Sequence, residues 1–249
     1  MQYIGLIPAR YASTRFPGKP LVDIGGKTMI QRVYEQASKA LEWVYVATDD
    51  ERIAENVNSF GGRVVMTSSN HKSGTDRCSE AIKKIQLIED KARFDVVINI
   101  QGDEPFVKPE QLRLLKSCFD DENVQIATLA NKIVDKDELF SPNVVKVITD
   151  KEYQATYFSR WPIPYIRNEE QENWLKAYPF LKHVGIYAYR TLILKQITML
   201  PPSSLEIAES LEQNRWIENG YKIFVKQTQF ETVAIDTPED LEKVKHLLI

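Results

Sequence analysis

Three basic residues stand close together in a stretch of the sequence that contains no acidic residue. Arg10, Arg15 and Lys19 lie within residues 9–22, among small residues and Gly18. Backbone amides in such a loop can surround phosphate oxygens, while arginine offers a planar fork and lysine a point charge. The stretch therefore predicts a site for a polyanion such as a triphosphate, with a solvated loop of incidental charges as the alternative. Its glycine spacing is neither GxGxxG nor GxxxxGKS/T, which disfavours a dinucleotide-dependent dehydrogenase and a P-loop NTPase.

Two aspartates are candidates for binding a metal ion. Asp103 follows the apolar stretch 95–101, after a glycine that would let a ligand approach, and Asp236 directly precedes a predicted helix. Carboxylates of this kind suit Mg²⁺, which is held through a few protein oxygens together with substrate phosphates. The sequence leaves open whether the fold brings the two aspartates together, and Asp236 could instead cap the helix. We interpret Glu104 as a supporting neighbour or a solvated residue.

The first half of the chain alternates short β-branched segments with helical patterns. This alternation is typical of a doubly wound α/β fold, in which helices cover both faces of a mostly parallel sheet. In such sheets ligands bind beyond the carboxyl ends of the strands, where the basic loop and Asp103 must both lie. Strands are expected at 3–8, 43–48, 63–66, 95–101 and 126–132, and helices at 29–41, 51–60, 76–89 and 109–120.

Beyond residue 140 the pattern becomes irregular and prolines interrupt it. We interpret this part as an added strand excursion in the C-terminal half, followed by a final helix with Thr237 as its N-cap and Pro238 in its first turn. We therefore predict one domain over residues 1–249. Strands are expected at 144–149, 154–159, 183–189 and 221–226, and a helix at 205–219.

Composition excludes several classes of protein. The chain has 249 residues, 43% of them hydrophobic, and a formal net charge of −3, which argues against intrinsic disorder. Binders of nucleic acid or of membrane surfaces are usually basic, so neither partner is expected. Two cysteines cannot form a disulfide framework or a zinc site. No apolar stretch is long enough to span a bilayer or to form a signal peptide, so we expect a cytoplasmic protein.

Five segments, in order along the chain, give the sequence a family resemblance. The opening segment alone would indicate only the wider nucleotidyltransferase group, but the set resembles the 3-deoxy-manno-octulosonate (Kdo) cytidylyltransferases, or CMP-Kdo synthetases. The resemblance implies a sheet of the nucleotide-diphospho-sugar transferase type (GT-A/Rossmann-like). It implies an enzyme that transfers CMP from CTP to Kdo for lipopolysaccharide biosynthesis, using Mg²⁺, and a homodimer with residues 150–200 as a sugar-binding and dimerisation excursion. The segments are 7–21, 71–77, 101–105, 183–187 and 236–241.

The resemblance also implies which residues form the site. Asp103 and Asp236 would hold the metal and, with Arg10 and Lys19, carry the catalysis. Arg160 is a second candidate, after Arg167, for the sugar carboxylate. The nucleotide would be bound by Ala9, Arg10, Ser13, Lys19, Ser73, Arg77 and Gln101, and Kdo by Arg167, His183, Tyr187, Glu212 and Gln213.

Several of these assignments have structural alternatives. Residues 73–77 could form only a helix cap, with Ser73 or Thr75 as the capping residue. His183 could be a buried structural histidine, and Tyr187 could pack in the core or at an interface. A cytidylyltransferase for another acidic sugar, such as a sialic acid, and a non-catalytic nucleotide-binding protein are the alternative functions.

One predicted helix combines a charged face with an aromatic residue. In residues 205–219, Glu209, Glu212 and Trp216 are spaced to share one face, which indicates partial burial against a ligand or partner. The sequence also departs from the family pattern here, because Asn214 stands where a leucine usually follows the Glu-Gln pair.

Overall fold

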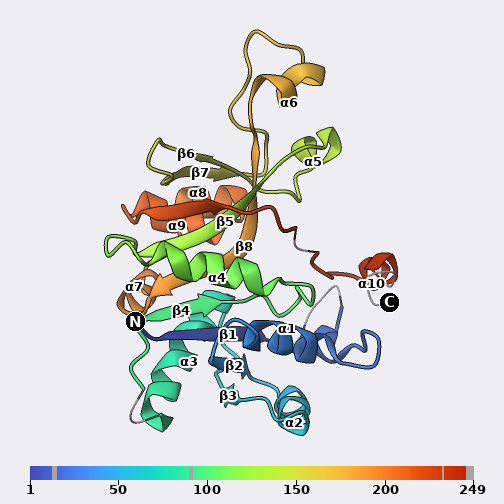
Figure 1. Ribbon diagram of the computed structural model, residues 1–249, viewed down its shortest axis with the longest axis vertical. Helices are drawn as coiled ribbons and strands as arrows, with labels where there is room; N and C mark the ends of the chain where they lie inside the picture. The colour runs from blue at the N-terminus through green and yellow to red at the C-terminus, as the bar shows by residue number, and fades with distance from the viewer. Residues whose placement is uncertain (13–15, 90–91, 232, 245–249) are drawn as a thin grey trace. The chain divides into compact units, whose positions relative to one another are not determined.

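The computed structural model describes residues 1–12, 16–89, 92–231 and 233–244 (Figure 1). The chain divides into two compact units, each built from separate stretches of sequence. Unit 1 contains residues 1–113, 188–198 and 232–249, and unit 2 contains residues 114–187 and 199–231. The interpretation of the chain as a single domain stays a prediction. No helix of the described residues is long and apolar enough to cross a membrane.

Unit 1 is built on a parallel sheet. Its strands lie in the order β3-β2-β1-β4. In the register of this sheet, Ile4 of β1 lies beside Trp43 of β2 on one side and Val97 of β4 on the other. β4 is buried along its whole length, as the continuous apolar segment predicts for a strand covered on both faces. The strands are β1 (Tyr3–Ala9), β2 (Trp43–Thr48), β3 (Val64–Met66) and β4 (Val96–Asn99).

Helices follow the strands of unit 1, and polar caps begin three of them. Thr28 accepts from the amide of Gln31, Asp50 from that of Arg52 and Ser73 from that of Asp76, as expected for N-cap residues. The predicted α/β class is confirmed, and the predicted helices of this half form within a few residues of their expected ends. The helices are η1 (Lys19–Leu21), α1 (Met29–Ser38), α2 (Glu51–Ser59), α3 (Gly74–Ile88), α4 (Pro109–Cys118), which continues into unit 2, α7 (Thr191–Ile197) and α10 (Pro238–Val244).

The C-terminal segment returns to unit 1 and packs against its N-terminal part. Ile235 and Val244 form one buried cluster with Ile24 and Met29. The amide of Ile235 also donates to the carbonyl of Asp103 at 2.9 Å. This packing brings Asp236, which follows Ile235, to the loop after β4.

Unit 2 contains the irregular second half of the chain. β5 and β9 pair in parallel, and β6 pairs in antiparallel fashion with β7 and with β8. The predicted strand excursion is therefore present. β8 passes from unit 2 into unit 1. The elements are β5 (Ile126–Lys132), α5 (Lys136–Phe140), β6 (Lys146–Thr149), β7 (Ala155–Ser159), η2 (Gln171–Asn173), α6 (Trp174–Ala177), β8 (Leu181–Arg190), α8 (Ser204–Glu209), α9 (Glu212–Glu218) and β9 (Ile223–Gln227).

The predicted helix 205–219 is wrong, because two short helices replace it. α8 ends where Ser210 adopts a left-handed backbone, with φ of 52°, and Leu211 is extended before α9 begins. A left-handed residue turns the chain out of a right-handed helix. Glu209 consequently belongs to α8, whereas Glu212 and Trp216 belong to α9, and the three do not share one helix face.

Candidate active site

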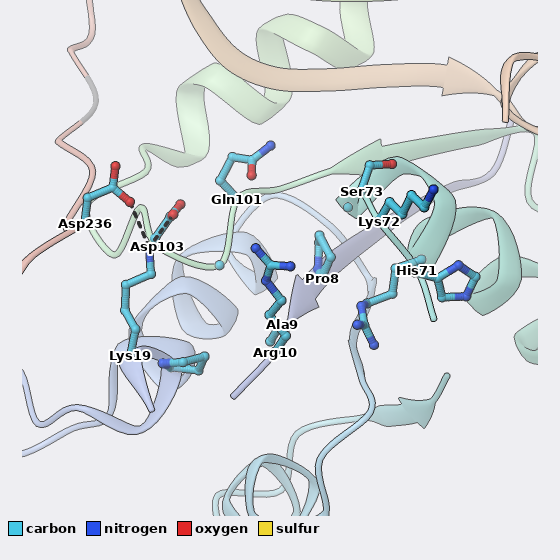
Figure 2. A pocket seen from close by; sticks show the side chains of 14 residues that line it. Pro8, Ala9, Arg10, Lys19, His71, Lys72, Ser73, Gln101, Asp103 and Asp236 are labelled. Atoms are coloured by element: carbon cyan, nitrogen blue, oxygen red, sulfur yellow. Dashed lines mark hydrogen bonds and ion pairs between the residues drawn. The ribbon is translucent and has the colours of Figure 1, made fainter. Parts of the chain in front are cut away.

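A pocket with a volume of about 250 Å³ lies in unit 1 beyond the end of β1 (Figure 2). Lys19, Asp103 and Asp236 lie at one end of it, and His71, Lys72 and Ser73 lie at the other. Most residues predicted for the nucleotide, the metal and catalysis line this one pocket. They are Ala9, Arg10, Lys19, Ser73, Arg77, Gln101, Asp103 and Asp236. Ser13 lies outside the described residues.

The ammonium of Lys19 joins the two aspartates. Its Nζ lies 2.7 Å from Oδ2 of Asp103 and 3.0 Å from Oδ1 of Asp236, and Figure 2 shows the three side chains pointing toward one another. The side chain of Lys19 is 14% exposed, against 28% and 37% for the two carboxylates. Residues far apart in the sequence thus meet at one point, which the sequence left open.

Two glycines allow this convergence. Gly18, directly before η1, has φ of 72°, and a Cβ there would lie 3.1 Å from the ring of Tyr11. Its amide donates to the carbonyl of Tyr11, so the turn that presents Lys19 requires glycine. A Cβ on Gly102 would lie 2.9 Å from the carbonyl oxygen of Pro8. Glycine therefore lets the loop with Asp103 approach the end of β1.

The start of α10 fixes the main chain around Asp236. The carboxylate of Asp240 accepts from the amides of Asp236 and Thr237, while Thr237 Oγ1 accepts from the amide of Asp240. This reciprocal pair is a helix cap, and the predicted N-cap role of Thr237 is confirmed. Asp236 itself directs Oδ1 to Lys19.

Ser73 and Arg77 have structural partners as well as places in the pocket. Ser73 Oγ accepts from the amide of Asp76 at 3.1 Å, so the cap interpretation of this segment is confirmed for Ser73. Arg77 is buried, donates to Thr67 Oγ1 at 2.7 Å and lies 3.3 Å from Asp49 Oδ2. These contacts fix the guanidinium of Arg77 at the wall of the pocket.

A second group of predicted residues gathers in unit 2. The ring of His183 lies 5.1 Å from that of Tyr187, which lies 5.2 Å from the ring of Trp216 on α9. His183 Nε2 is 3.0 Å from Thr128 Oγ1, and burial lowers the pKa of His183 to about 3, so the ring is neutral. Burial raises the pKa of Tyr187 well above its usual value, and the charge of Glu212 adds to this effect.

The two polar residues that open α9 complete this group. Glu212 is partly exposed and accepts from the guanidinium of Arg215 at 2.8 Å, whereas Gln213 is buried. Four of the five residues predicted for the sugar acid therefore lie on β8 and on the first turn of α9. The arrangement offers a neutral imidazole, a phenol, a carboxylate and an amide, which are partners suited to hydroxyl groups.

Comparison with known proteins places the chain in a family. A family model described as cytidylyltransferase matches residues 4–227. The chain belongs to the cytidylyltransferase family. It is 58% identical over 247 residues to a 3-deoxy-manno-octulosonate cytidylyltransferase of Parabacteroides distasonis, with 98% of this chain and 96% of the relative covered. A protein of the same name from Bacteroides thetaiotaomicron is 58% identical, with 100% and 98% covered.

A solved structure supports the fold of this cytidylyltransferase. It is CMP:2-keto-3-deoxy-manno-octonic acid synthetase complexed with CTP, which is 44% identical and covers 100% of this chain and 98% of its own, with a TM-score of 0.89. The predicted nucleotidyltransferase type of fold is thereby confirmed. Asp236 lies beyond the segment that the family model matches, so its place in the pocket comes from the structure.

The two arginines considered for the sugar carboxylate are not in the group formed by His183 and Tyr187. Arg167 is exposed and lines a separate hollow of unit 2 with Tyr165 and residues 168–174, and the residues described around that hollow include none of the other four. Arg160 donates its guanidinium to the carbonyls of Glu209, Pro142 and Ser210. The main chain of this cytidylyltransferase thus holds the guanidinium of Arg160, and its interpretation as a second candidate for the sugar carboxylate stays a prediction.

Two features of the pocket were not anticipated from the sequence. His71 and Lys72 line it, and His71 Nε2 contacts the carboxylate of Glu80. Partial burial acts to raise the pKa of Glu80, but hydrogen bonds from Lys84, the amide of Ser68 and His71 lower it to about 2. In the sequence, the signal that could have identified His71 was its place at the start of 71–77, one of the five segments that carry the family resemblance.

Glu104 is buried rather than solvated. It is 6% exposed, and its Oε2 has no hydrogen-bond partner among the described residues. Burial, with the neighbouring charge of Asp103, raises the pKa of Glu104 to about 8. A neutral carboxyl group therefore lies directly beside the aspartate of the pocket.

Proposed function

We propose that this member of the cytidylyltransferase family transfers CMP from CTP to Kdo, giving CMP-Kdo and pyrophosphate. The observation that carries the proposal is the basic pocket in which Lys19 joins Asp103 and Asp236. The names of the relatives, and of the solved structure complexed with CTP, supply the substrates.

The residues of the pocket suit nucleotidyl transfer. A hydroxyl of the sugar attacks the α-phosphorus of CTP, a new oxygen–phosphorus bond forms, and the bond to the pyrophosphate breaks. Such a reaction depends on positioning and on neutralising charge more than on covalent catalysis. Arg10 and Lys19, both lining the pocket, would neutralise charge on the phosphates and on the leaving pyrophosphate.

We propose Mg²⁺ as the metal and Asp103 and Asp236 as its protein ligands. Two carboxylates that already converge on one cation fit an ion that takes its remaining ligands from substrate phosphates and water. When bound, Mg²⁺ would supply charge neutralisation and polarisation of the phosphate.

We propose that His183, Tyr187, Glu212 and Gln213 bind the sugar acid. Their neutral and acidic groups suit vicinal hydroxyls. Arg167 remains the candidate for the sugar carboxylate, because its guanidinium is exposed, whereas that of Arg160 is engaged by main-chain carbonyls.

We further propose that the protein works in the cytoplasm as a homodimer, in the supply of activated Kdo for lipopolysaccharide. Within residues 150–200, Trp161 is 65% exposed and Tyr165 72% exposed. Large apolar side chains at the surface suit a contact between subunits. Sedimentation equilibrium of the full chain tests the homodimer.

Pyrophosphate release tests the function directly. We expect release only when CTP, Kdo and Mg²⁺ are all present, and none when any one is omitted. An assay with a sialic acid in place of Kdo is the matched comparison. Turnover with sialic acid and none with Kdo would replace the proposed substrate by the alternative one.

A further inference from the structure

Glu212 and Gln213 lie between two residues that bond to the same strand. Glu209, at the end of α8, precedes the pair, and Asn214 follows it directly. Both residues direct their polar atoms to the end of β7 (Ala155–Ser159) and the residue after it. This arrangement is separate from the groups proposed to touch substrate.

Glu209 receives three hydrogen bonds from this part of the chain. Its carboxylate accepts from Ser159 Oγ at 2.8 Å, from the amide of Arg160 at 2.9 Å and from the hydroxyl of Tyr157 at 3.2 Å. Partial burial acts to raise the pKa of Glu209, but these bonds lower it, so the group is ionised. In return, Arg160 Nε donates to the carbonyl of Glu209 at 2.7 Å.

Asn214 makes the second attachment. Its side chain is fully buried. Oδ1 accepts from the amide of Phe158 at 3.2 Å, and Nδ2 donates to the carbonyl of Phe158 at 3.0 Å. A buried amide that satisfies both main-chain groups of one residue fixes both distance and orientation, because either bond would be costly to leave unmade.

Glu209 and Asn214 together form hydrogen bonds with every residue from Tyr157 to Arg160. Tyr157 and Ser159 are held through their side chains, and Phe158 and Arg160 through their main chain. Between the attachments, Ser210 in its left-handed conformation ends α8. The first turn of α9 is therefore fixed relative to β7 from both sides.

The same contacts align α9 with the aromatic residues of β8. The ring of Phe158 lies 5.0 Å from that of His183, while Trp216 on α9 lies against Tyr187. Moving α9 relative to β7 would thus shift Glu212 and Gln213 relative to His183 and Tyr187.

We propose that Glu209 and Asn214 are positioning residues for the sugar acid, which hold Glu212 and Gln213 in place against His183 and Tyr187. The proposal rests on the proposed function, because it takes Kdo as the ligand of this group. It gives a role to Asn214, at which the sequence departs from the family pattern.

Steady-state kinetics with both substrates test the proposal. We expect Asn214→Ala and Glu209→Ala to raise the KM for Kdo by about tenfold, since a displacement of 1 Å can cost up to two orders of magnitude. The KM for CTP should be unchanged. We expect Glu209→Gln to recover part of the wild-type KM for Kdo, because its single amide oxygen can still accept from the amide of Arg160 while its NH2 group can donate to the hydroxyl of Ser159.

Glu218→Ala is the matched control. Glu218, also on α9, accepts from Ser204 Oγ at 2.8 Å and from the amide of Leu205 at 3.1 Å. Its removal loosens α9 from α8 without touching β7. We expect a lower Tm with an unchanged KM for Kdo, which separates positioning from general loss of stability.

The outcomes are distinguishable. An unchanged KM for Kdo in folded Glu209→Ala, or an equal rise in Glu218→Ala, would overturn the proposal and leave the proposed function intact. If Asn214→Ala fails to fold, the comparison of Glu209→Ala with Glu209→Gln decides alone. Wild-type protein that turns over no Kdo contradicts the proposed function, and this inference with it.

Discussion

Lys19 Nζ lies 2.7 Å from Asp103 Oδ2. The same ammonium also reaches Asp236, so it neutralises one of the two negative charges that a divalent metal would use. A metal ion that binds both carboxylates must therefore compete with Lys19 for them.

Replacing Lys19 should separate its competition with the metal ion from its contribution to turnover. We expect Lys19→Met to bind Mn²⁺ roughly two- to fivefold more tightly in the absence of nucleotide, because a partly exposed cation that pairs with both carboxylates is lost. Turnover should fall by about two orders of magnitude, because a cation near the phosphates is lost. Electron paramagnetic resonance measures free Mn²⁺. Lys27→Met, which breaks a surface pair with Glu35, is the control, and weaker Mn²⁺ binding in Lys19→Met would contradict the competition.

The two aspartates should be needed for turnover but not for folding. Asp103→Asn and Asp236→Asn each keep the size of the side chain while removing its charge. We expect kcat to fall by about three orders of magnitude, with a circular dichroism melt close to wild type. Asp121→Asn, in a surface turn with Asn123, should keep full activity. Near-wild-type kcat of either pocket variant at limiting Mg²⁺ would make the metal assignment wrong.

Glu104 should make stability depend on pH. Its pKa is raised from 4.5 to about 8, so the folded protein binds a proton that the unfolded chain releases between these values. The contribution is fully present below about pH 4.5 and is lost as pH rises toward 8, on the order of 5 kcal/mol over the range. Urea unfolding at pH 5 and pH 8 measures it. Glu104→Gln should flatten this slope, and an unchanged slope would show that Glu104 is not the group that titrates.

The two arginines considered for the sugar carboxylate should respond differently to the same substitution. Arg160→Met removes a charged donor from the carbonyls of Glu209, Pro142 and Ser210, and we expect it to lower the free energy of unfolding by about 2 kcal/mol. Arg167→Met, at an exposed position, should change stability by less than about 0.5 kcal/mol and raise the KM for Kdo. An unchanged KM in Arg167→Met would remove Arg167 from the sugar site.

The sequence was most informative where local pattern decides structure. The strand 126–132 and the cap at Thr237 form as predicted, because burial pattern and capping chemistry act over a few residues. Asp103 could be placed at the ligand-binding edge since it follows a buried apolar segment. The approach of Asp236 depends on the packing of Ile235, which no local pattern contains.

The single helix expected at 205–219 is wrong because of contacts that lie outside the segment. Its periodicity runs on without interruption, whereas bonds from Glu209 and Asn214 to β7 accompany the break at Ser210. Contacts between residues that are distant in sequence thus override the helical preference. For the same reason the sequence could name Arg160 as a cation but not show that carbonyl groups would surround it.

The attachment of Ile235 to the loop of Asp103 has a consequence for synthesis of the protein on the ribosome. Chains emerge from the N-terminus, so Lys19 and Asp103 can meet long before Asp236 exists. The second carboxylate reaches them only when the segment with Ile235 and Val244 packs against Ile24 and Met29. A nascent chain can therefore bring Lys19 and Asp103 together without the second aspartate, and the pocket is complete only once translation has passed that segment.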